Sequence, residues 1–189
     1  PLPLPDAPED NLRCRVSLKG GDNITTDDIT PASAELSSMR SNIPLMSQYC
    51  YHNYDPDFAA RAAEYGKSII IGGVNYGQGS SREHAAINPM YLGVKAVIAK
   101  SIARIHKGNL INHGIVPLTF ADASDYERID LADELEIRDF PAQIQRGRVT
   151  VQNRTKGVSF DAVLDLSAEA KEVLLCGGQL RYLRKKLEA

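Results

Sequence analysis

The sequence has no tryptophan, three cysteines in 189 residues, and no apolar run as long as a membrane span requires. The cysteines at positions 14, 50 and 176 include no closely spaced pair, and their odd number argues against a disulfide framework. The formal net charge of −2 gives no basic field of the kind that attracts nucleic acid. We therefore expect a cytoplasmic globular protein that neither enters a membrane nor binds nucleic acid.

With 43% hydrophobic residues, the length suffices for one well-cored domain and is marginal for two. The opening is rich in proline and lacks an initiator methionine, which is typical of a linker cut from a longer chain. We expect a linker over residues 1–11 and a single domain over residues 12–189.

Apolar runs alternate with helical patterns through the middle of the chain. The expected order is strand, helix, strand, helix, strand, at 68–73, about 81–90, 94–99, 101–112 and 115–120. This order predicts a parallel βαβ core. Beyond residue 122, shorter alternating segments predict antiparallel strands, followed by a helix over 168–176 and a last helix after two glycines. The pattern alone gives an α/β or α+β class.

Residues 76–84, Tyr-Gly-Gln-Gly-Ser-Ser-Arg-Glu-His, lie between an expected strand and an expected helix. Gly77 and Gly79 allow close approach to a ligand, and a helix starting near Ser80 would direct amide hydrogens at an anion. Arg82 can donate two hydrogen bonds to a carboxylate. Ser80 with Glu83 also fits an ordinary capping box. The local pattern leaves a carboxylate site and simple helix capping equally open, whereas a dinucleotide site lacks its third glycine.

These nine residues resemble the signature of the aconitase superfamily's mobile domain, and the resemblance continues through residues 85–101 and 102–118. An earlier segment, residues 21–32 with Thr26-Asp27 at its centre, resembles a second motif of that family in the same order. The resemblance implies a three-layer β/β/α swivelling domain with a parallel βαβ core plus antiparallel strands. It also implies a lyase, an aconitate hydratase of the tricarboxylic acid cycle, acting on a tricarboxylate.

The resemblance assigns roles to particular residues. Ser80 would be the catalytic base, acting as an alkoxide, and Asp27 would orient it. The residues that would bind substrate are Thr26, Arg40, Ser81 and Arg82. His84 and His106 also match the family, but we assign neither to the chemistry, because helices often carry such residues.

The resemblance also implies what lies outside the chain. A 4Fe-4S cluster would sit in cluster-bearing aconitase domains or a large subunit, because the three cysteines here lack the spacing of cluster ligands. No metal site is expected in this chain, and the chain by itself should be inactive.

Two positions bear on specificity. Arg40 resembles the arginine that holds the remaining substrate carboxylate in aconitases. This favours a tricarboxylate over the substrate of isopropylmalate dehydratases, which has an apolar group at the corresponding place. Asp28 departs from the histidine usual in aconitases, and its charge beside the site would weaken carboxylate binding. The alternatives are the small subunit of an isopropylmalate or homoaconitate dehydratase, and a non-catalytic RNA-binding or regulatory module.

Overall fold

The computed structural model describes residues 4–188, apart from the side chain of residue 35. The first three residues of the expected linker therefore lie outside the described part. Seven strands pair in the order β1-β2-β3-β4-β7-β6-β5 and close into a barrel. Their bounds are Leu12–Lys19 (β1), Ser68–Gly72 (β2), Val94–Ala99 (β3), Val116–Phe120 (β4), Glu134–Ile137 (β5), Arg148–Asn153 (β6) and Val158–Val163 (β7).

The barrel is built from two kinds of pairing. Strands β1 to β4 run parallel to one another, with Ile69 beside both Val16 and Ala96. Strands β5 to β7 pair antiparallel and close the barrel onto β1 and β4. The mixed α/β class is confirmed. The layered arrangement is not, because the sheet curves round until its edges meet.

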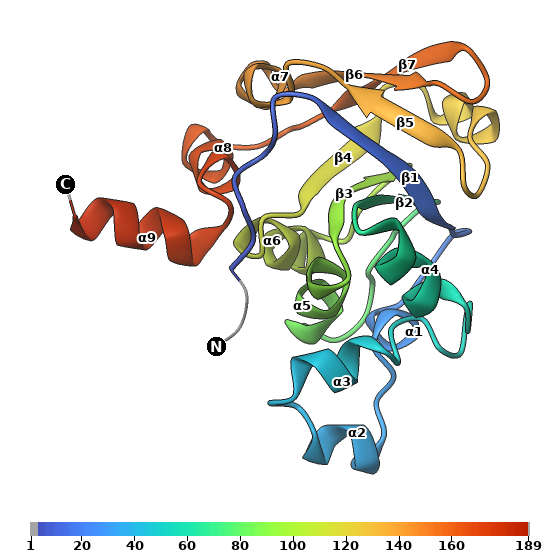
Figure 1. Ribbon diagram of the computed structural model, residues 1–189, viewed down its shortest axis with the longest axis vertical. Coiled ribbons are helices and arrows are strands. Elements are labelled where there is room, and N and C mark those ends of the chain that lie inside the picture. Colours follow the sequence, from blue (N-terminus) through green and yellow to red (C-terminus); the bar gives the residue numbers. More distant parts are fainter. Residues whose placement is uncertain (1–3, 189) are drawn as a thin grey trace.

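The helices are short, and several cover the outer face of the parallel strands (Figure 1). Their bounds are Thr26–Ile29 (α1), Ala34–Ser38 (α2), Ile43–Ser47 (α3), Phe58–Tyr65 (α4), His84–Tyr91 (α5), Arg104–Asn112 (α6), Phe140–Arg146 (α7), Ala168–Leu175 (α8) and Gln179–Leu187 (α9), with a 3-10 helix at Ala123–Arg128. None of the helices described is long and apolar enough to cross a bilayer.

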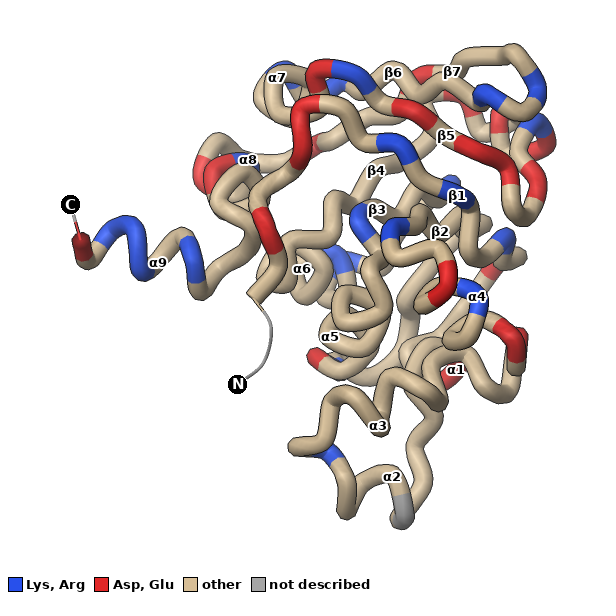
Figure 2. The backbone as a smooth tube through the Cα atoms, viewed as in Figure 1, with Lys and Arg blue, Asp and Glu red and all other residues tan. Residues whose placement is uncertain are grey.

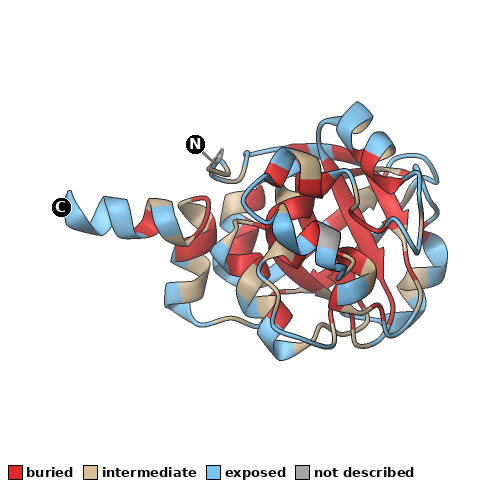
Figure 3. Cartoon of the chain, turned by 90° about the horizontal axis from the view of Figure 1, so that it is seen from below, coloured by how far each residue is buried: buried red, intermediate tan, exposed pale blue. Residues whose placement is uncertain are grey.

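Two apolar cores lie on the two faces of the parallel strands. Ile69 and Ile71 belong to a core that receives side chains from all seven strands and fills the barrel, whereas Ile70 faces a second core beneath α4, α5 and α6. Burial on both faces explains why β2 reads as a continuous apolar run rather than an alternating one. In Figure 3 the buried residues follow the sheet, while α9 projects from the body with most of its surface exposed.

Two expected helix starts were wrong. Helix α5 begins at His84, because Tyr76 and Gln78 form isolated bridges that tie the preceding loop to other segments. Helix α6 begins at Arg104, because the Ser101 hydroxyl accepts a hydrogen bond from the Asn75 amide at 2.7 Å instead of capping the helix.

Candidate active site

The two sequence motifs meet because the strands that precede them are parallel neighbours. Strand β1 leads into residues 20–25 and β2 leads into residues 73–83, so both loops leave the same end of the barrel. Backbone hydrogen bonds join them, from the Thr26 amide to the Gln78 carbonyl at 2.8 Å and from the Gly77 amide to the Ile24 carbonyl at 2.7 Å. The Thr-Asp motif, expected on a loop, continues into the short helix α1.

A cavity of about 330 Å³ opens at this end of the barrel. Residues 30–46, which carry α2 and part of α3, form one wall, and residues 80–84 form the other. Four residues proposed from the sequence line it: Arg40, Ser80, Ser81 and Arg82. Arg40 and Ser80 are far apart in the chain, so the fold brings together a cation and a hydroxyl that spacing alone does not connect.

The two serines present free hydroxyls to the cavity. Ser80 and Ser81 are both exposed, and neither hydroxyl makes a hydrogen bond to any group in the described part of the chain. The capping-box interpretation was wrong here, because Glu83 occupies the N-cap position and its side chain makes no capping bond. The interpretation of a helix N-terminus at Ser80 fails for the same reason.

Arg82 is held in place by groups from the first motif. Its guanidinium forms an ion pair with Asp27 and donates to the Thr30 carbonyl at 3.3 Å. Asp27 was expected to orient Ser80, yet its carboxylate contacts Arg82 instead. Asp27 is therefore positioned to act on the site through Arg82.

Thr26 lies beneath the serine loop rather than in the cavity wall. Its side chain is buried, and its hydroxyl donates to the Ser80 carbonyl at 3.0 Å. Thr26 is not among the residues that line the cavity. Its contact holds the main chain of Ser80, and its role in substrate binding stays a prediction.

Asp28 is turned away from the cavity and closes a capping box at the start of α1. Its carboxylate accepts from the Thr25 amide and from the Thr25 hydroxyl, both at 2.8 Å, while the Asp28 amide donates back to that hydroxyl at 3.0 Å. Asp28 is not among the residues that line the cavity, and its predicted weakening of carboxylate binding stays a prediction.

We expect Asp28→Ala to lower the free energy of unfolding by about 0.5–1 kcal/mol, because the cap of α1 is lost. Urea unfolding followed by circular dichroism measures this change. The matched control is Asp57→Ala, since Asp57 occupies the N-cap position of α4 without a side-chain capping bond. Equal losses in both variants would contradict the role given to Asp28.

Arg40 is an isolated cation in a segment that is poor in charge. Between Asp28 and Asp55 the sequence has two charged residues, Glu35 and Arg40. Arg40 lies between α2 and α3, in a part of the backbone that is mostly tan in Figure 2. Its side chain is exposed and forms no ion pair with the described side chains. The guanidinium is therefore available to an anion in the cavity.

A buried aromatic cluster supports the loop from below. The hydroxyls of Tyr51 and Tyr76 form a hydrogen bond, and the Tyr76 ring lies 5.4 Å from the ring of His106. Burial raises the pKa of both tyrosines and lowers the pKa of His106 to about 4, so all three are neutral near pH 7. His106 thus packs in the interior, against the ring of Tyr76.

Gly77 can only be glycine where the loop crosses His106. Its φ is +79°, and a β-carbon there would lie 2.1 Å from Cδ2 of His106. We expect Gly77→Ala to destabilise the chain by about 2 kcal/mol or more, through strain and overlap together. Urea unfolding measures the loss.

The matched control for this change is Gly108→Ala, in the middle of α6. A β-carbon at Gly108 meets no atom within 4 Å, and alanine favours the helix by about 0.5–1 kcal/mol. A loss of stability at position 108 as large as at position 77 would show that the His106 contact is not the cause.

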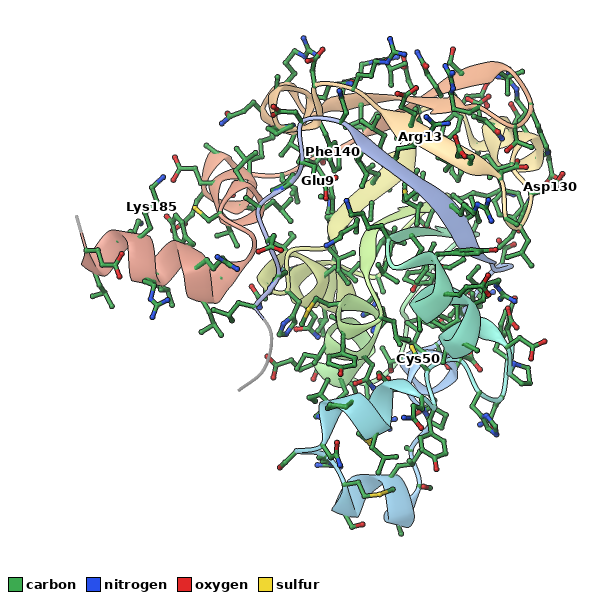
Figure 4. The ribbon with its side chains drawn as sticks, in the orientation of Figure 1. Glu9, Arg13, Cys50, Asp130, Phe140 and Lys185 are labelled. Atoms are coloured by element: carbon green, nitrogen blue, oxygen red, sulfur yellow. The ribbon has the colours of Figure 1, made fainter. Side chains whose placement is uncertain are left out.

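The cysteines do not form a ligand set for an iron-sulfur cluster. Cys14 lies in the barrel core, where burial raises its pKa to about 12, and Cys50 lies in the second core near α4 (Figure 4). Cys176 follows α8, on another side of the molecule. Among residues 4–34 and 36–188, no three His, Cys, Asp or Glu side chains are grouped to hold a metal ion. A cluster does not fit this chain's own residues.

The lining also contains residues to which no role was assigned from the sequence. Leu36 and Met46 give one wall an apolar surface, and His84, which matched the family but was assigned no chemistry, lines the cavity together with Arg82. The place of His84 in the motif, two residues after Arg82, was the available signal for it. Two guanidinium groups and two hydroxyls around one cavity can bind an anion with several carboxylates and place a base beside it.

Known proteins resemble the chain over most of its length. A family model described as the aconitase C-terminal domain matches residues 33–123. A putative mitochondrial aconitate hydratase of Emericella nidulans is 39% identical over 69% of this chain and 17% of its own length. The chain thus spans about a sixth of that relative.

A smaller protein matches almost from end to end. The 3-isopropylmalate dehydratase small subunit 2 of Archaeoglobus fulgidus is 39% identical over 88% of this chain and 92% of its own length. The crystal structure of a 3-isopropylmalate dehydratase from Methanocaldococcus jannaschii superposes with a TM-score of 0.78 at 29% identity, covering 94% of this chain and 96% of that one.

Proposed function

Because the chain belongs to the family of the aconitase C-terminal domain and the 3-isopropylmalate dehydratase small subunit, we propose that it supplies the base and carboxylate clamps of a hydro-lyase. The observation that carries the proposal is the convergence of Arg40, Ser80, Ser81 and Arg82 on one cavity. The relatives named aconitate hydratase and 3-isopropylmalate dehydratase support the same class of reaction.

The proposed substrate is a tricarboxylate of the citrate and isocitrate type, interconverted through cis-aconitate. Arg82 and Ser81 would bind one carboxylate, and Arg40 would bind another through its unpaired guanidinium. Asp27 and the Thr30 carbonyl would hold Arg82 in the orientation that this requires. Binding between two cations would fix the position, relative to Ser80, of the substrate carbon that loses its proton.

Ser80 would remove that proton. A serine hydroxyl titrates far above neutrality, so its anion must be stabilised by cations nearby, and Arg82 is the nearest cation in the sequence. Thr26 would keep the hydroxyl aimed at the cavity by holding the Ser80 carbonyl. Release of hydroxide from the substrate would also need a Lewis acid. An iron-sulfur cluster would supply it, and the ligands of that cluster would come from another portion.

The partner that we propose is therefore a cluster-bearing portion, either a separate large subunit or further domains of a longer chain. The lengths of the relatives support both arrangements, since the aconitate hydratase is much longer than this chain and the small subunit is not. A second candidate substrate is the isopropylmalate type, favoured by the apolar wall of Leu36 and Met46.

The deciding experiment mixes the chain with a reconstituted cluster-bearing large portion and offers cis-aconitate, homoaconitate and isopropylmaleate in parallel hydration assays. Preference for cis-aconitate would support Arg40 as a carboxylate clamp. Preference for isopropylmaleate would place the chain with the small subunits. No hydration of any of the three would contradict the proposed reaction class.

A further inference from the structure

His84 makes a contact that joins the two walls of the cavity. It is the first residue of α5, and its Nε2 lies 3.0 Å from the Arg40 carbonyl oxygen. Because a carbonyl can only accept, the proton must be on Nε2, and the imidazole donates it. The ring thus reaches from the wall that carries Ser80 to the wall that carries Arg40.

The Arg40 wall has little regular structure of its own to fix it. Helices α2 and α3 are five residues each, and residues 39–42 between them are exposed or only partly buried. The buried anchors of this segment are Leu36 on one side of Arg40 and Ile43 and Met46 on the other. The main chain at Arg40 therefore depends on contacts outside the core.

The other end of the contact is fixed firmly. The Thr30 hydroxyl donates to the His84 carbonyl at 3.3 Å and accepts from the buried Asn88 amide at 3.1 Å. The Thr30 carbonyl accepts from Arg82. His84 and Arg82 thus share Thr30 as a common support, and the imidazole extends that support to Arg40.

We propose that His84 is a positioning residue that holds the main chain of Arg40, and through it sets the distance between the two carboxylate clamps. The role of the clamps rests on the proposed function, whereas the His84 to Arg40 contact itself does not. Loss of the donor would let residues 39–42 open, and the Arg40 guanidinium would spend less time facing Arg82.

The first test is amide hydrogen exchange on the chain itself, which needs no substrate. The Asn42 amide donates to the Met39 carbonyl at 2.8 Å, so its exchange reports opening of this turn. We expect His84→Phe to speed exchange there about fivefold, the factor that corresponds to one net hydrogen bond. His84→Gln, whose amide can donate, should exchange within about twofold of the unchanged chain.

The matched control is His113→Phe, which likewise removes an imidazole donor. His113 donates to Glu83 at 3.1 Å, so it supports the start of α5 through a residue other than Arg40. We expect no change in exchange at residues 39–42. Equal acceleration by His84→Phe and His113→Phe would overturn the proposal, because it would show general loosening of α5.

The second test uses the chain reconstituted with its cluster-bearing portion. His84→Phe should raise KM for the tricarboxylate about fivefold with kcat within about twofold, and His84→Gln should restore KM. In an Arg40→Lys background the His84 change should add little, because the residue acts through Arg40.

The outcomes separate this inference from the proposed function. Turnover by the unchanged complex, together with unaltered exchange and KM in His84→Phe, would overturn the positioning role and leave the function intact. Absence of turnover would count against the proposed function, while the exchange rates would still decide whether His84 holds Arg40.

Discussion

Ser80→Ala in the reconstituted enzyme is expected to lower kcat by about 10²–10⁴-fold with KM changed less than about threefold. The physical reason is that the Ser80 hydroxyl is exposed to the cavity and unpaired, so its removal deletes the proposed base while both guanidinium clamps stay in place. Steady-state hydration of cis-aconitate measures both constants.

The matched control is Ser159→Ala, an exposed serine on β7 outside the cavity, which should leave both constants unchanged. The fold of Ser80→Ala should also be unchanged, because no bond of that hydroxyl to a described group is lost. An unchanged kcat, or a rise in KM as large as the fall in kcat, would contradict the role of Ser80 as the base.

Arg40→Lys is expected to raise KM for cis-aconitate roughly 10–100-fold with a small change in kcat. Lysine keeps the charge but loses the planar pair of donors that matches a carboxylate, and hydrogen bonds to charged groups contribute about 1.5–3 kcal/mol. The measurement is the same hydration assay, with substrate binding followed separately by calorimetry.

Two controls accompany this change. Arg146→Lys alters an exposed arginine at the end of α7, on the far side of the barrel from α2 and α3, and should have no effect (Figure 1). Isopropylmaleate, which has an apolar group in place of the third carboxylate, should lose much less affinity than cis-aconitate. An equal rise of KM for both substrates would mean that Arg40 does not set specificity.

The order of strands and helices was largely readable from the sequence. The strand at 94–99 and the helix ending at Leu175, before Gly177, follow the predictions, because long apolar runs and glycine stops act locally. Helix α7 was not predicted, since it is only seven residues long and begins after Asp139, a non-glycine residue with φ of +48°. Closure of the barrel is likewise absent from the pattern, because it depends on which strand edges meet.

The site was predicted residue by residue, but its contacts were not. Position in a motif pointed to Ser80 and Arg82, whereas the pairing of Asp27 with Arg82 depends on two loops meeting in space. A capping box was one of two interpretations left open at Ser80, and one is found at Thr25, although both segments satisfy the same spacing. Hydrogen bonds between the loops hold residues 76–80 outside a helix and so decide between the two.

By itself, the sequence determined a mixed class of helices and strands, the two motifs and the likeness to a hydro-lyase family, since these depend on local composition and order. Only the tertiary structure decided that Arg40 and Ser80 line one cavity, that Asp28 caps a helix, and that His84 reaches the Arg40 carbonyl. The physical reason is that parallel pairing of β1 with β2 brings distant loops together at one end of the barrel. Hydrogen bonds between these loops then determine which polar groups face the cavity and which hold the main chain.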